Sequence, residues 1–287
     1  MDSFAKWTKI GICICLGVAN IFIWYAVWYW ETHQNPVITF FDVGQGDAIF
    51  IEAPNGNQIL IDGGPGNAIL AKLGSVMPFW DRHIDLLLLT HPHADHLGGF
   101  IEVLRRYGVE QVLGPAIRYT TPEYQAWRNI MDEKKIREVA AFRGRRIDVG
   151  RGIFLDVFAP FENFSGRMLK NPHDANVVVR LRTGDRSWLF MGDAEKPIEH
   201  QLRSNPGEIA SDILKVGHHG SKTSSTEAFL RAVNPRFAVI SVGRKNRYGH
   251  PHPEVLERFE RFGIPVLRTD IEGDITFVTD GVSLTRK

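Results

Sequence analysis

A row of metal-binding side chains follows directly on an apolar run, and this feature constrains the fold more tightly than any other. Residues 84–89 read IDLLLL, which predicts a buried strand, and the next letters are THPHADH. His91 and His93 alternate in an extended segment and can project toward one ion. Asp95 and His96, at the start of the helix that should follow, can reach a second ion. A helix N-cap would explain the aspartate but not the three histidines. The spacing therefore predicts a site for two metals.

This HxHxDH spacing resembles the signature of the metallo-β-lactamase superfamily. That resemblance implies an α/β fold, an αββα sandwich with one or two metals at the mouth between its sheets. In residues 191–195 (MGDAE), Asp193 matches the aspartate that bridges the two ions of that family. In residues 213–221 (ILKVGHHGS), His218 matches the histidine that binds the second ion, with His219 as the alternative. The resemblance implies two divalent metal ions, Zn²⁺ or Mn²⁺, as cofactors.

The third motif of the family departs from the usual pattern in this chain. Residues 171–179 read NPHDANVVV, where relatives keep a histidine shortly before the strand that leads to Asp193. By position, Asn176 stands where the ligand or its substitute is expected. His173 or Asp174 could also turn toward the metal. The choice among the three stays open, and one metal position would be weaker or completed by water and substrate.

A narrower resemblance rests on four longer segments, which lie at residues 41–48 (FDVGQGDA), 60–64 (LIDGG), 218–225 (HHGSKTSS) and 246–253 (NRYGHPHP). Together they look like the β-lactamase-like domain of ComEC-type competence proteins and their stand-alone relatives. The resemblance covers residues 37–280 and implies a metal-dependent phosphodiesterase, which in competence proteins is thought to degrade the DNA strand that is not imported. It does not carry over the channel, because the chain has one apolar segment long enough to cross a bilayer and a polytopic channel needs many.

The same resemblance assigns roles to single residues. The implied metal ligands are His91, His93, Asp95, His96, Asp193 and His218, with Asn176 or His173 in the third motif. Two cations bridged by Asp193 would lower the pKa of a water, so that hydroxide is available near neutral pH, and would stabilise charge on the phosphoester. No protein nucleophile is required. Asp95 and Asp193 are therefore the expected catalytic residues, and Asp95 either binds the second ion or orients the attacking water.

Loops around these motifs carry a second set of candidates. The expected substrate-binding residues are His219, Lys222, Arg247, Tyr248 and His250, and with Lys215, Arg244 and Lys245 they would form a cationic cradle for phosphate. Scattered, solvated surface charge is the competing interpretation. Tyr248 could stack on a base or simply pack its loop. Gln45, Asp47 and Asp62 are expected to shape the rim of the pocket.

The first thirty residues contain a candidate membrane anchor. Residues 10–30 form 21 positions without a charge, which at about 1.5 Å per residue cross the hydrocarbon core of a bilayer. The run ends in WYAVWYW, which suits a membrane interface better than the small residues of a signal-peptide cleavage site. Lys6 and Lys9 precede it and Glu31 follows it. The positive-inside rule then predicts cytoplasmic residues 1–9 and an extracytoplasmic domain over residues 37–287.

Composition and patterning agree with one ordinary globular domain behind this anchor. The chain is 44% hydrophobic and 23% charged with a net charge of +1, which excludes a disordered chain and a strongly basic DNA-coating protein. Both cysteines, Cys13 and Cys15, lie in the apolar segment, so metal coordination in the domain must use histidine and carboxylate. The sequence predicts helices at 94–107, 122–134, 194–203, 226–233 and 253–262, and strands at 37–43, 48–53, 58–61, 154–158, 177–181, 213–216, 237–242 and 275–278.

The sequence thus predicts a membrane-anchored, two-metal hydrolase of phosphodiesters, with DNA as the substrate and a separate DNA-channel protein as a possible partner. Two alternatives stay open. One is a hydrolase of another extracytoplasmic ester, such as a phosphocholine-bearing cell-wall polymer, because the same two-metal chemistry serves many substrates. The other is a non-catalytic DNA-uptake scaffold, which the missing third-motif histidine allows.

Overall fold

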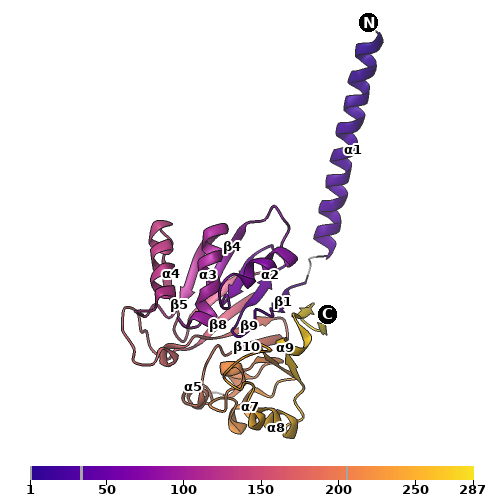
Figure 1. Cartoon of the computed structure of the whole chain (residues 1–287). Helices are drawn as coiled ribbons and strands as arrows, with labels where there is room; N and C mark the ends of the chain where they lie inside the picture. The colour runs from indigo at the N-terminus through magenta and orange to yellow at the C-terminus, as the bar shows by residue number, and fades with distance from the viewer. Residues whose placement is uncertain (1, 33–34, 205) are drawn as a thin grey trace.

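The computed structural model describes residues 2–32, 35–204 and 206–287. Two β-sheets pack face to face, helices cover the outer face of each, and one long helix stands apart from the sandwich (Figure 1). This arrangement confirms the predicted α/β fold with αββα layers and one N-terminal apolar helix.

The first sheet has eight strands in the order β15-β14-β1-β2-β3-β4-β5-β6. Neighbours from β3 to β6 run parallel, and the other neighbours run antiparallel. Its strands are β1 Val37–Phe40, β2 Ile49–Glu52, β3 Gln58–Ile61, β4 His83–Leu88, β5 Gly108–Gly114, β6 Glu138–Ala140, β14 Ile275–Thr279 and β15 Leu284–Arg286.

The second sheet has seven strands in the order β13-β12-β11-β10-β9-β8-β7, and β10 to β13 are parallel. Its strands are β7 Arg146–Gly150, β8 Ile153–Ala159, β9 Val178–Thr183, β10 Arg186–Phe190, β11 Ile213–Lys215, β12 Phe237–Ile240 and β13 Val266–Arg268. The carboxyl ends of β10, β11 and β12 therefore meet at one edge, where ligand sites of parallel sheets form.

Helices cover the outer faces of the sheets. Next to the first sheet lie α2 Ala68–Val76, α3 Ala94–Arg106 and α4 Pro122–Glu133. The second half of the chain contains α5 Lys196–Leu202, α6 Pro206–Ile209, α7 Glu227–Val233, α8 Pro253–Arg261 and α9 Thr269–Glu272. Two short 3₁₀ turns are η1 Pro172–Ala175 and η2 Gly217–Gly220. In α4, Pro122 occupies the first turn and the Thr121 hydroxyl accepts a hydrogen bond from the Tyr124 amide, which caps the helix.

Three apolar layers hold the sandwich together. The layer between the sheets contains Phe40, Trp188 and Phe277, all fully buried. A second layer, which includes Trp127, packs α2, α3 and α4 against the first sheet. A third layer, which includes Phe259, packs α5, α7 and α8 against the second sheet. Strand β8 alternates fully and half-buried residues, as a strand with one face in the core should.

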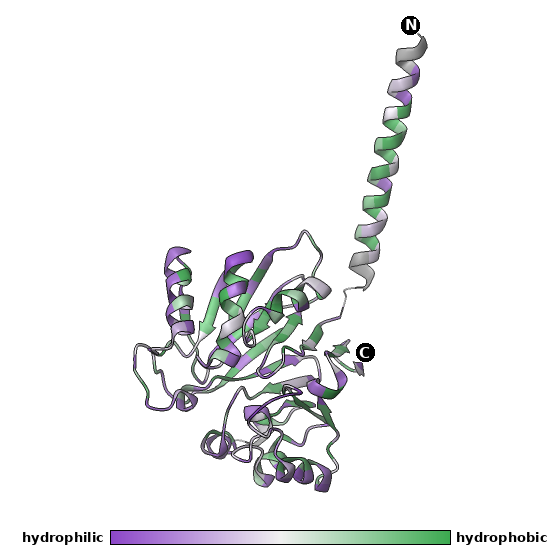
Figure 2. Ribbon diagram, in the orientation of Figure 1, coloured by the Kyte–Doolittle hydropathy of each residue, from purple (hydrophilic) through white to green (hydrophobic). Residues whose placement is uncertain are grey.

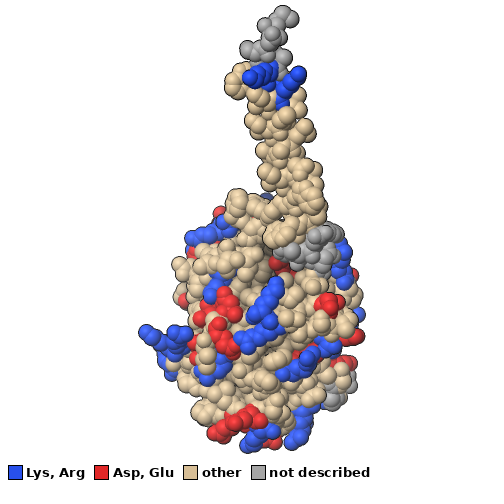
Figure 3. Space-filling view, turned by 90° about the vertical axis from the view of Figure 1, so that its right-hand side faces the viewer, with Lys and Arg blue, Asp and Glu red and all other residues tan. Residues whose placement is uncertain are grey.

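The N-terminal helix α1, Asp2–Thr32, contains an apolar stretch from Lys6 to Trp28. This stretch of 23 residues is long and apolar enough to cross a membrane, and none of its most apolar window is buried against the domain. In the ribbon coloured by hydropathy, the middle of α1 is largely green, whereas the elements of the sandwich alternate between green and purple (Figure 2). In the space-filling view the described charges of α1 gather near its N-terminal end (Figure 3).

Candidate metal centre

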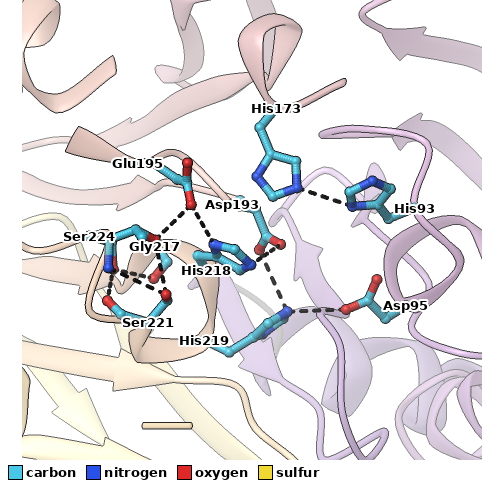
Figure 4. A network of polar contacts seen from close by, with 12 residues as sticks. His93, Asp95, His173, Asp193, Glu195, Gly217, His218, His219, Ser221 and Ser224 are labelled. Atoms are coloured by element: carbon cyan, nitrogen blue, oxygen red, sulfur yellow. Dashed lines mark hydrogen bonds and ion pairs between the residues drawn. The ribbon is translucent and has the colours of Figure 1, made fainter. Parts of the chain in front are cut away.

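The predicted ligands come from strand ends that meet at the mouth of the sandwich. His91 follows β4, Asp193 follows β10, and His218 and His219 lie in η2 directly after β11. His173 lies in η1, just before β9. Because β9 runs antiparallel to β10, its first residues reach the same edge as the end of β10. The fold therefore brings together side chains from both halves of the chain (Figure 4).

The HPHADH segment is the turn from β4 into α3. His93 is the N-cap of α3 in extended conformation, and its carbonyl accepts the amides of His96 and Leu97. Asp95 and His96 lie in the first helical turn, on the side facing the second sheet's ligands. His91 and His96 are fully buried, whereas Asp95 keeps about a third of its side chain exposed. The turn thus offers both buried and accessible ligands.

One cluster of ligand atoms comprises His91, His93, His173 and Asp193, whose candidate atoms all lie within 4.8 Å of one another. The distance from His91 Nε2 to Asp193 Oδ2 is 3.6 Å. His93 Nδ1 lies 3.0 Å from His91 Nε2 and 3.1 Å from His173 Nε2. Of the third-motif candidates, His173 is the one that the structure places in this cluster.

A second cluster comprises Asp95, His96 and His219, again within 4.8 Å. His219 Nε2 lies 3.3 Å from Asp95 Oδ2. Asp193 reaches this cluster with its other oxygen, since Oδ1 lies 3.3 Å from His96 Nε2 and 3.5 Å from His219 Nε2. The two carboxylate oxygens of Asp193 therefore face different groups of ligands.

The buried histidines are oriented from behind. His96 Nδ1 lies 2.8 Å from Asp62 Oδ2, and Asp62 also accepts hydrogen bonds from the amide and hydroxyl of Thr90. His219 Nδ1 donates to the Ser241 carbonyl at 2.9 Å. In both rings Nδ1 is engaged, so Nε2 is left to face the centre, which is the usual arrangement of metal-binding histidines.

The polar atoms at the centre fit a cation. Asp193 Oδ1, His96 Nε2 and His219 Nε2 are buried, and none of them forms a hydrogen bond with any residue that the structure describes. Although burial lowers the pKa of His96, the nearby carboxylates, Asp193 first, raise it well above its ordinary value. A site that raises the pKa of a fully buried imidazole is one that attracts positive charge. Histidine nitrogen and carboxylate oxygen are the donors that Zn²⁺ and Mn²⁺ accept.

His218 and His219 occupy an unusual backbone conformation. Their φ angles are 48° and 52°, in the left-handed region that non-glycine residues rarely adopt and that is concentrated at functional sites. His219 consequently points to the second cluster. His218 is partly exposed, with Nε2 3.7 Å from Asp193 Oδ2 and Nδ1 3.1 Å from Glu195 Oε1. Glu195 also accepts from the Thr223 hydroxyl at 2.6 Å, which fixes this carboxylate beside His218.

The side chain of Asn176 forms hydrogen bonds with backbone groups at this edge of the sheet. Its side-chain NH₂ donates to the Met191 carbonyl at 2.8 Å, and its carbonyl oxygen accepts the amide of Asp193 at 2.9 Å. Asn176 is fully buried and holds the turn that presents Asp193. Asp174, the remaining candidate of the third motif, is exposed and accepts a hydrogen bond from Asn171.

Lys215 lies beneath the centre, which corrects its expected place in a phosphate cradle. It is fully buried, forms an ion pair with Asp47, and donates to the Gly192 carbonyl at 3.1 Å. Burial raises the pKa of Asp47, but Lys215 and His219 together lower it by more, so the pKa of this carboxyl lies below its ordinary value. Asp47 Oδ1 also lies 3.4 Å from His219 Nδ1. The lysine therefore compensates the buried carboxylate of Asp47 behind the candidate ligands.

The glycine before Asp47 explains part of the DVGQGD segment. Gly46 has a φ of 140°, and a Cβ at this position would overlap the Asp95 carbonyl oxygen. The Asp47 amide donates to that same oxygen at 3.2 Å. The segment thus packs its backbone directly on the first turn of α3. Gln45 lines the cavity and accepts the Gly243 amide at 3.2 Å, whereas Asp47 and Asp62 lie behind the histidines.

A cavity of about 460 Å³ opens over the two clusters, and its lining includes Asp95, His218, Tyr248 and His250. Tyr248 and His250 stack with their ring centroids 6.0 Å apart. Burial, together with His218, lowers the pKa of His250 to about 4. Lys222 and Arg247 are exposed and lie outside this lining; the Arg247 guanidinium packs over the Tyr248 ring.

An αββα sandwich whose mouth gathers buried histidines around a shared aspartate defines a class of metal-dependent hydrolases. The chain belongs to the metallo-beta-lactamase superfamily, which it matches over residues 41–244. This confirms the family predicted from the motifs.

Curated relatives narrow the class. The chain is similar to ComE operon protein 3 of Bacillus subtilis (strain 168), with 32% identity over 93% of this chain and 35% of that protein. It is similar to competence protein ComA of Neisseria gonorrhoeae, with 30% identity over 85% of this chain and 32% of that protein. The chain thus spans about a third of the length of these relatives. It is a metallo-beta-lactamase-fold hydrolase related to competence proteins, as the narrower resemblance predicted.

Among solved structures, the fold is similar to that of the metallo-beta-lactamase fold protein YhfI from Bacillus subtilis. The TM-score is 0.58, with 85% of this chain and 100% of that chain covered at 11% identity. At such low identity the likeness supports the fold alone.

Sequence reasoning missed three parts of the site. Glu195 stands two positions after Asp193 in the MGDAE segment, and that proximity was the available signal. The Lys215–Asp47 pair joins segments far apart in the chain, so no local pattern could reveal it. The role of Asn176 as a backbone clamp depends on the turn after β10, which the sequence does not specify.

Proposed function

We propose that this domain is a two-metal hydrolase of phosphodiesters and that its substrate is DNA. The position of Asp193 carries the proposal. Its Oδ2 lies 3.6 Å from His91 Nε2, and its Oδ1 lies 3.3 Å from His96 Nε2. A carboxylate that presents one oxygen to each of two ligand groups is the arrangement that bridges a pair of ions.

The proposed ligands divide between the two clusters. His91, His93 and His173 would hold one ion, while Asp95, His96 and His219 would hold the other, and Asp193 would be shared. His173 is preferred to Asn176, because both polar atoms of the asparagine amide already bind backbone groups. His219, the alternative to His218 in the sequence prediction, is proposed as the ligand in place of His218, because its Nε2 is buried beside Asp193 whereas the His218 side chain is partly exposed.

The chain's own residues would complete the reaction around the ions. Divalent ions held by these residues would supply Lewis acidity toward the phosphate and would lower the pKa of a water. Burial raises the pKa of Asp95, but His96 and His219 lower it more, so this carboxylate stays ionised. Asp95 faces the cavity and can orient the attacking water through a hydrogen bond. His218 lines the cavity with its Nδ1 held by Glu195 and its Nε2 3.7 Å from Asp193 Oδ2, so it can contact the oxygen of a bound phosphoester that leaves.

The rim of the cavity suits a nucleotide. Tyr248 is 58% exposed and stacked with His250, so the exposed part of its ring can contact a base. The Arg247 guanidinium lies over the same ring and can contact an adjacent phosphate. Lys222 is exposed on the loop that follows η2 and adds a further positive charge for a longer strand.

We also propose that α1 anchors the protein as a single-pass membrane helix. Lys6 and Lys9 at its start place residues 1–9 in the cytoplasm and the hydrolase domain, residues 37–287, outside. Because the resemblance to ComEC-type proteins does not extend to the channel, a separate DNA-channel protein is the proposed partner. The division of the chain at residues 10–30 and 37 stays a prediction.

DNA cleavage by the full chain tests the proposal. The protein, purified in detergent and loaded with Mn²⁺ or Zn²⁺, is incubated with single- and double-stranded DNA. Asp193→Ala should lose cleavage, while Asp185→Ala, which removes an exposed carboxylate from the β9–β10 turn, should keep it. Intact DNA with two ions bound would point to another ester, such as a phosphocholine-bearing polymer. DNA that is bound but not cut, with no metal present, would indicate a scaffold.

A further inference from the structure

The loop between α2 and β4 displays two aromatic side chains beside the membrane helix. Phe79 is 79% exposed and Trp80 is 58% exposed, and their rings are in edge contact with centroids 4.7 Å apart. Trp80 also contacts Tyr25 of α1, at 5.9 Å between centroids. A groove of about 1090 Å³ separates the loop from α1, and its lining includes Ile21, Phe22, Tyr25, Pro78, Phe79 and Trp80.

The loop is fixed rather than loose. Asp81 accepts hydrogen bonds from the side chain of Gln58 at 2.7 Å and from the amide of His83 at 3.0 Å. The Asp81 amide donates to the Pro78 carbonyl at 2.9 Å, which closes the turn. Met77, at the base of the loop, is buried in the layer under α2. The two aromatic rings are therefore held outward by the domain behind them.

We propose that Phe79 and Trp80 insert into the interfacial layer of the bilayer that α1 crosses, and so dock the domain on the membrane. The apolar stretch of α1 ends at Trp28. Along a helix that rises about 1.5 Å per residue, Tyr25 lies about 5 Å and Ile21 about 10 Å inside that end. Side chains that contact this part of α1 reach the depth at which interfacial aromatic residues are buried. The groove they line is then filled by lipid.

This docking would orient the metal centre. The loop precedes β4 and the HPHADH turn follows it, so they lie at opposite ends of the same strand. Six residues of strand span about 20 Å. A domain held to the bilayer by Phe79 and Trp80 would therefore direct its metal centre away from the membrane surface, toward a substrate approaching from the aqueous side. The inference rests on the proposed membrane span and not on nuclease activity.

Depth-dependent fluorescence quenching in the chain of residues 1–287 tests the docking. Single-cysteine proteins are labelled and reconstituted in phosphatidylcholine vesicles that carry nitroxide at the headgroup or deep in the acyl chain. One protein keeps only the native Cys15, and two others lack both native cysteines and carry Phe79→Cys or Glu257→Cys. Glu257 is exposed on α8, at the far end of the domain from α1 (Figure 1).

The proposal predicts loss of fluorescence at position 79 with headgroup nitroxide, loss at Cys15 with deep nitroxide, and no loss at position 257. Quenching at Cys15 without quenching at position 79 would overturn the docking and leave the anchor intact. Absence of quenching at both would overturn the docking together with the membrane span. DNA cleavage is measured separately, so failure of the proposed function would be distinguishable.

A second measurement uses a label at position 257 only, so that Phe79 is retained in the reference protein. Energy transfer from a label at position 257 to an acceptor lipid reports the height of the domain above the bilayer. In the double variant Phe79→Ser, Trp80→Ser the domain should no longer be held in one orientation, so the distribution of distances should become broader and its mean shorter. Ile271→Ser, which removes another exposed apolar side chain, should leave the distribution unchanged. An unchanged distance in the double variant would contradict the proposal.

Discussion

Asp62 does not line the cavity, yet the proposed metal centre depends on it. Its carboxylate is fully buried, lies 2.8 Å from His96 Nδ1 and accepts two hydrogen bonds from Thr90. Burial raises the pKa of Asp62, and His96 opposes that rise. The aspartate therefore fixes which nitrogen of His96 faces the centre.

Asp62→Ala is expected to weaken metal binding by about 10- to 100-fold, because a ligand that loses its supporting carboxylate loses its orientation. A competition titration against a chelator with known affinity measures this. Asp185→Ala, in an exposed turn, is the control and should bind as the wild type does. Equal affinity in all three proteins would show that His96 needs no such support.

Glu138 should make the stability of the fold depend on pH, and this effect does not involve the candidate metal ligands. Burial raises the pKa of this carboxyl to about 7, against a hydrogen bond from the Ala116 amide and the attraction of Arg128. The pKa of Glu138 is higher in the folded chain than in the unfolded chain. At a pH between these two pKa values the carboxyl binds a proton in the folded chain but not in the unfolded chain. The free energy of unfolding therefore falls as the pH rises from the unfolded pKa to the folded pKa. The fall is about 3 kcal/mol at most.

Thermal unfolding at a series of pH values tests this. The wild type should lose more stability than Glu138→Gln as pH rises from about 4 toward 8, since the amide cannot ionise. Parallel pH profiles for the two proteins would contradict the account. The amide oxygen of glutamine can keep the hydrogen bond that Ala116 donates.

Helix α3 must begin close against the loop that follows β3. The Gly99 amide donates to the Gly64 carbonyl at 2.8 Å, and a Cβ on Gly99 would overlap the Gly63 carbonyl oxygen. This close approach sets the position of the first turn, which carries Asp95 and His96.

Gly99→Ala should therefore destabilise the fold by about 1–3 kcal/mol, because the neighbouring backbone has to move. Gly74→Ala, in α2, is the matched control: a Cβ there meets nothing within 4 Å, and alanine should stabilise the helix by up to about 1 kcal/mol. Denaturant unfolding compares the two variants. Equal stability would show that the α3 contact tolerates a methyl group.

The elements with strong local patterns were predictable from sequence. Helices α3, α4 and α8 begin at the predicted residues, and every predicted strand has a counterpart. Several elements were not predicted, because their residues carry too weak a periodic signal: helices α2, α6 and α9, and strands β5, β6, β7, β13 and β15. In the site, the candidate ligands after β4 and β10 were predictable from their motifs, and their assignment as ligands stays a proposal. The burial of Lys215 did not, because burial depends on which strands pair.

At the scale of the whole molecule, metal binding should be coupled to stability. Ions that bind only the folded chain stabilise it by about 3–4 kcal/mol when their concentration is 100 to 1,000 times the dissociation constant. A chelator should therefore lower the melting temperature of the full chain, while Asp193→Ala should melt at the same temperature with or without it. A wild-type protein indifferent to the chelator would argue against a metal that links the two halves of the sandwich.

The central claim is that Asp193 bridges two ions, and electron paramagnetic resonance of the Mn²⁺-loaded full chain tests it most directly. With elemental analysis giving the number of ions, the account predicts two Mn²⁺ per chain and the spectrum of an exchange-coupled pair in the wild type, with the coupling lost in Asp193→Ala. A single ion per chain, or two ions with the spectrum of isolated Mn²⁺, would contradict it.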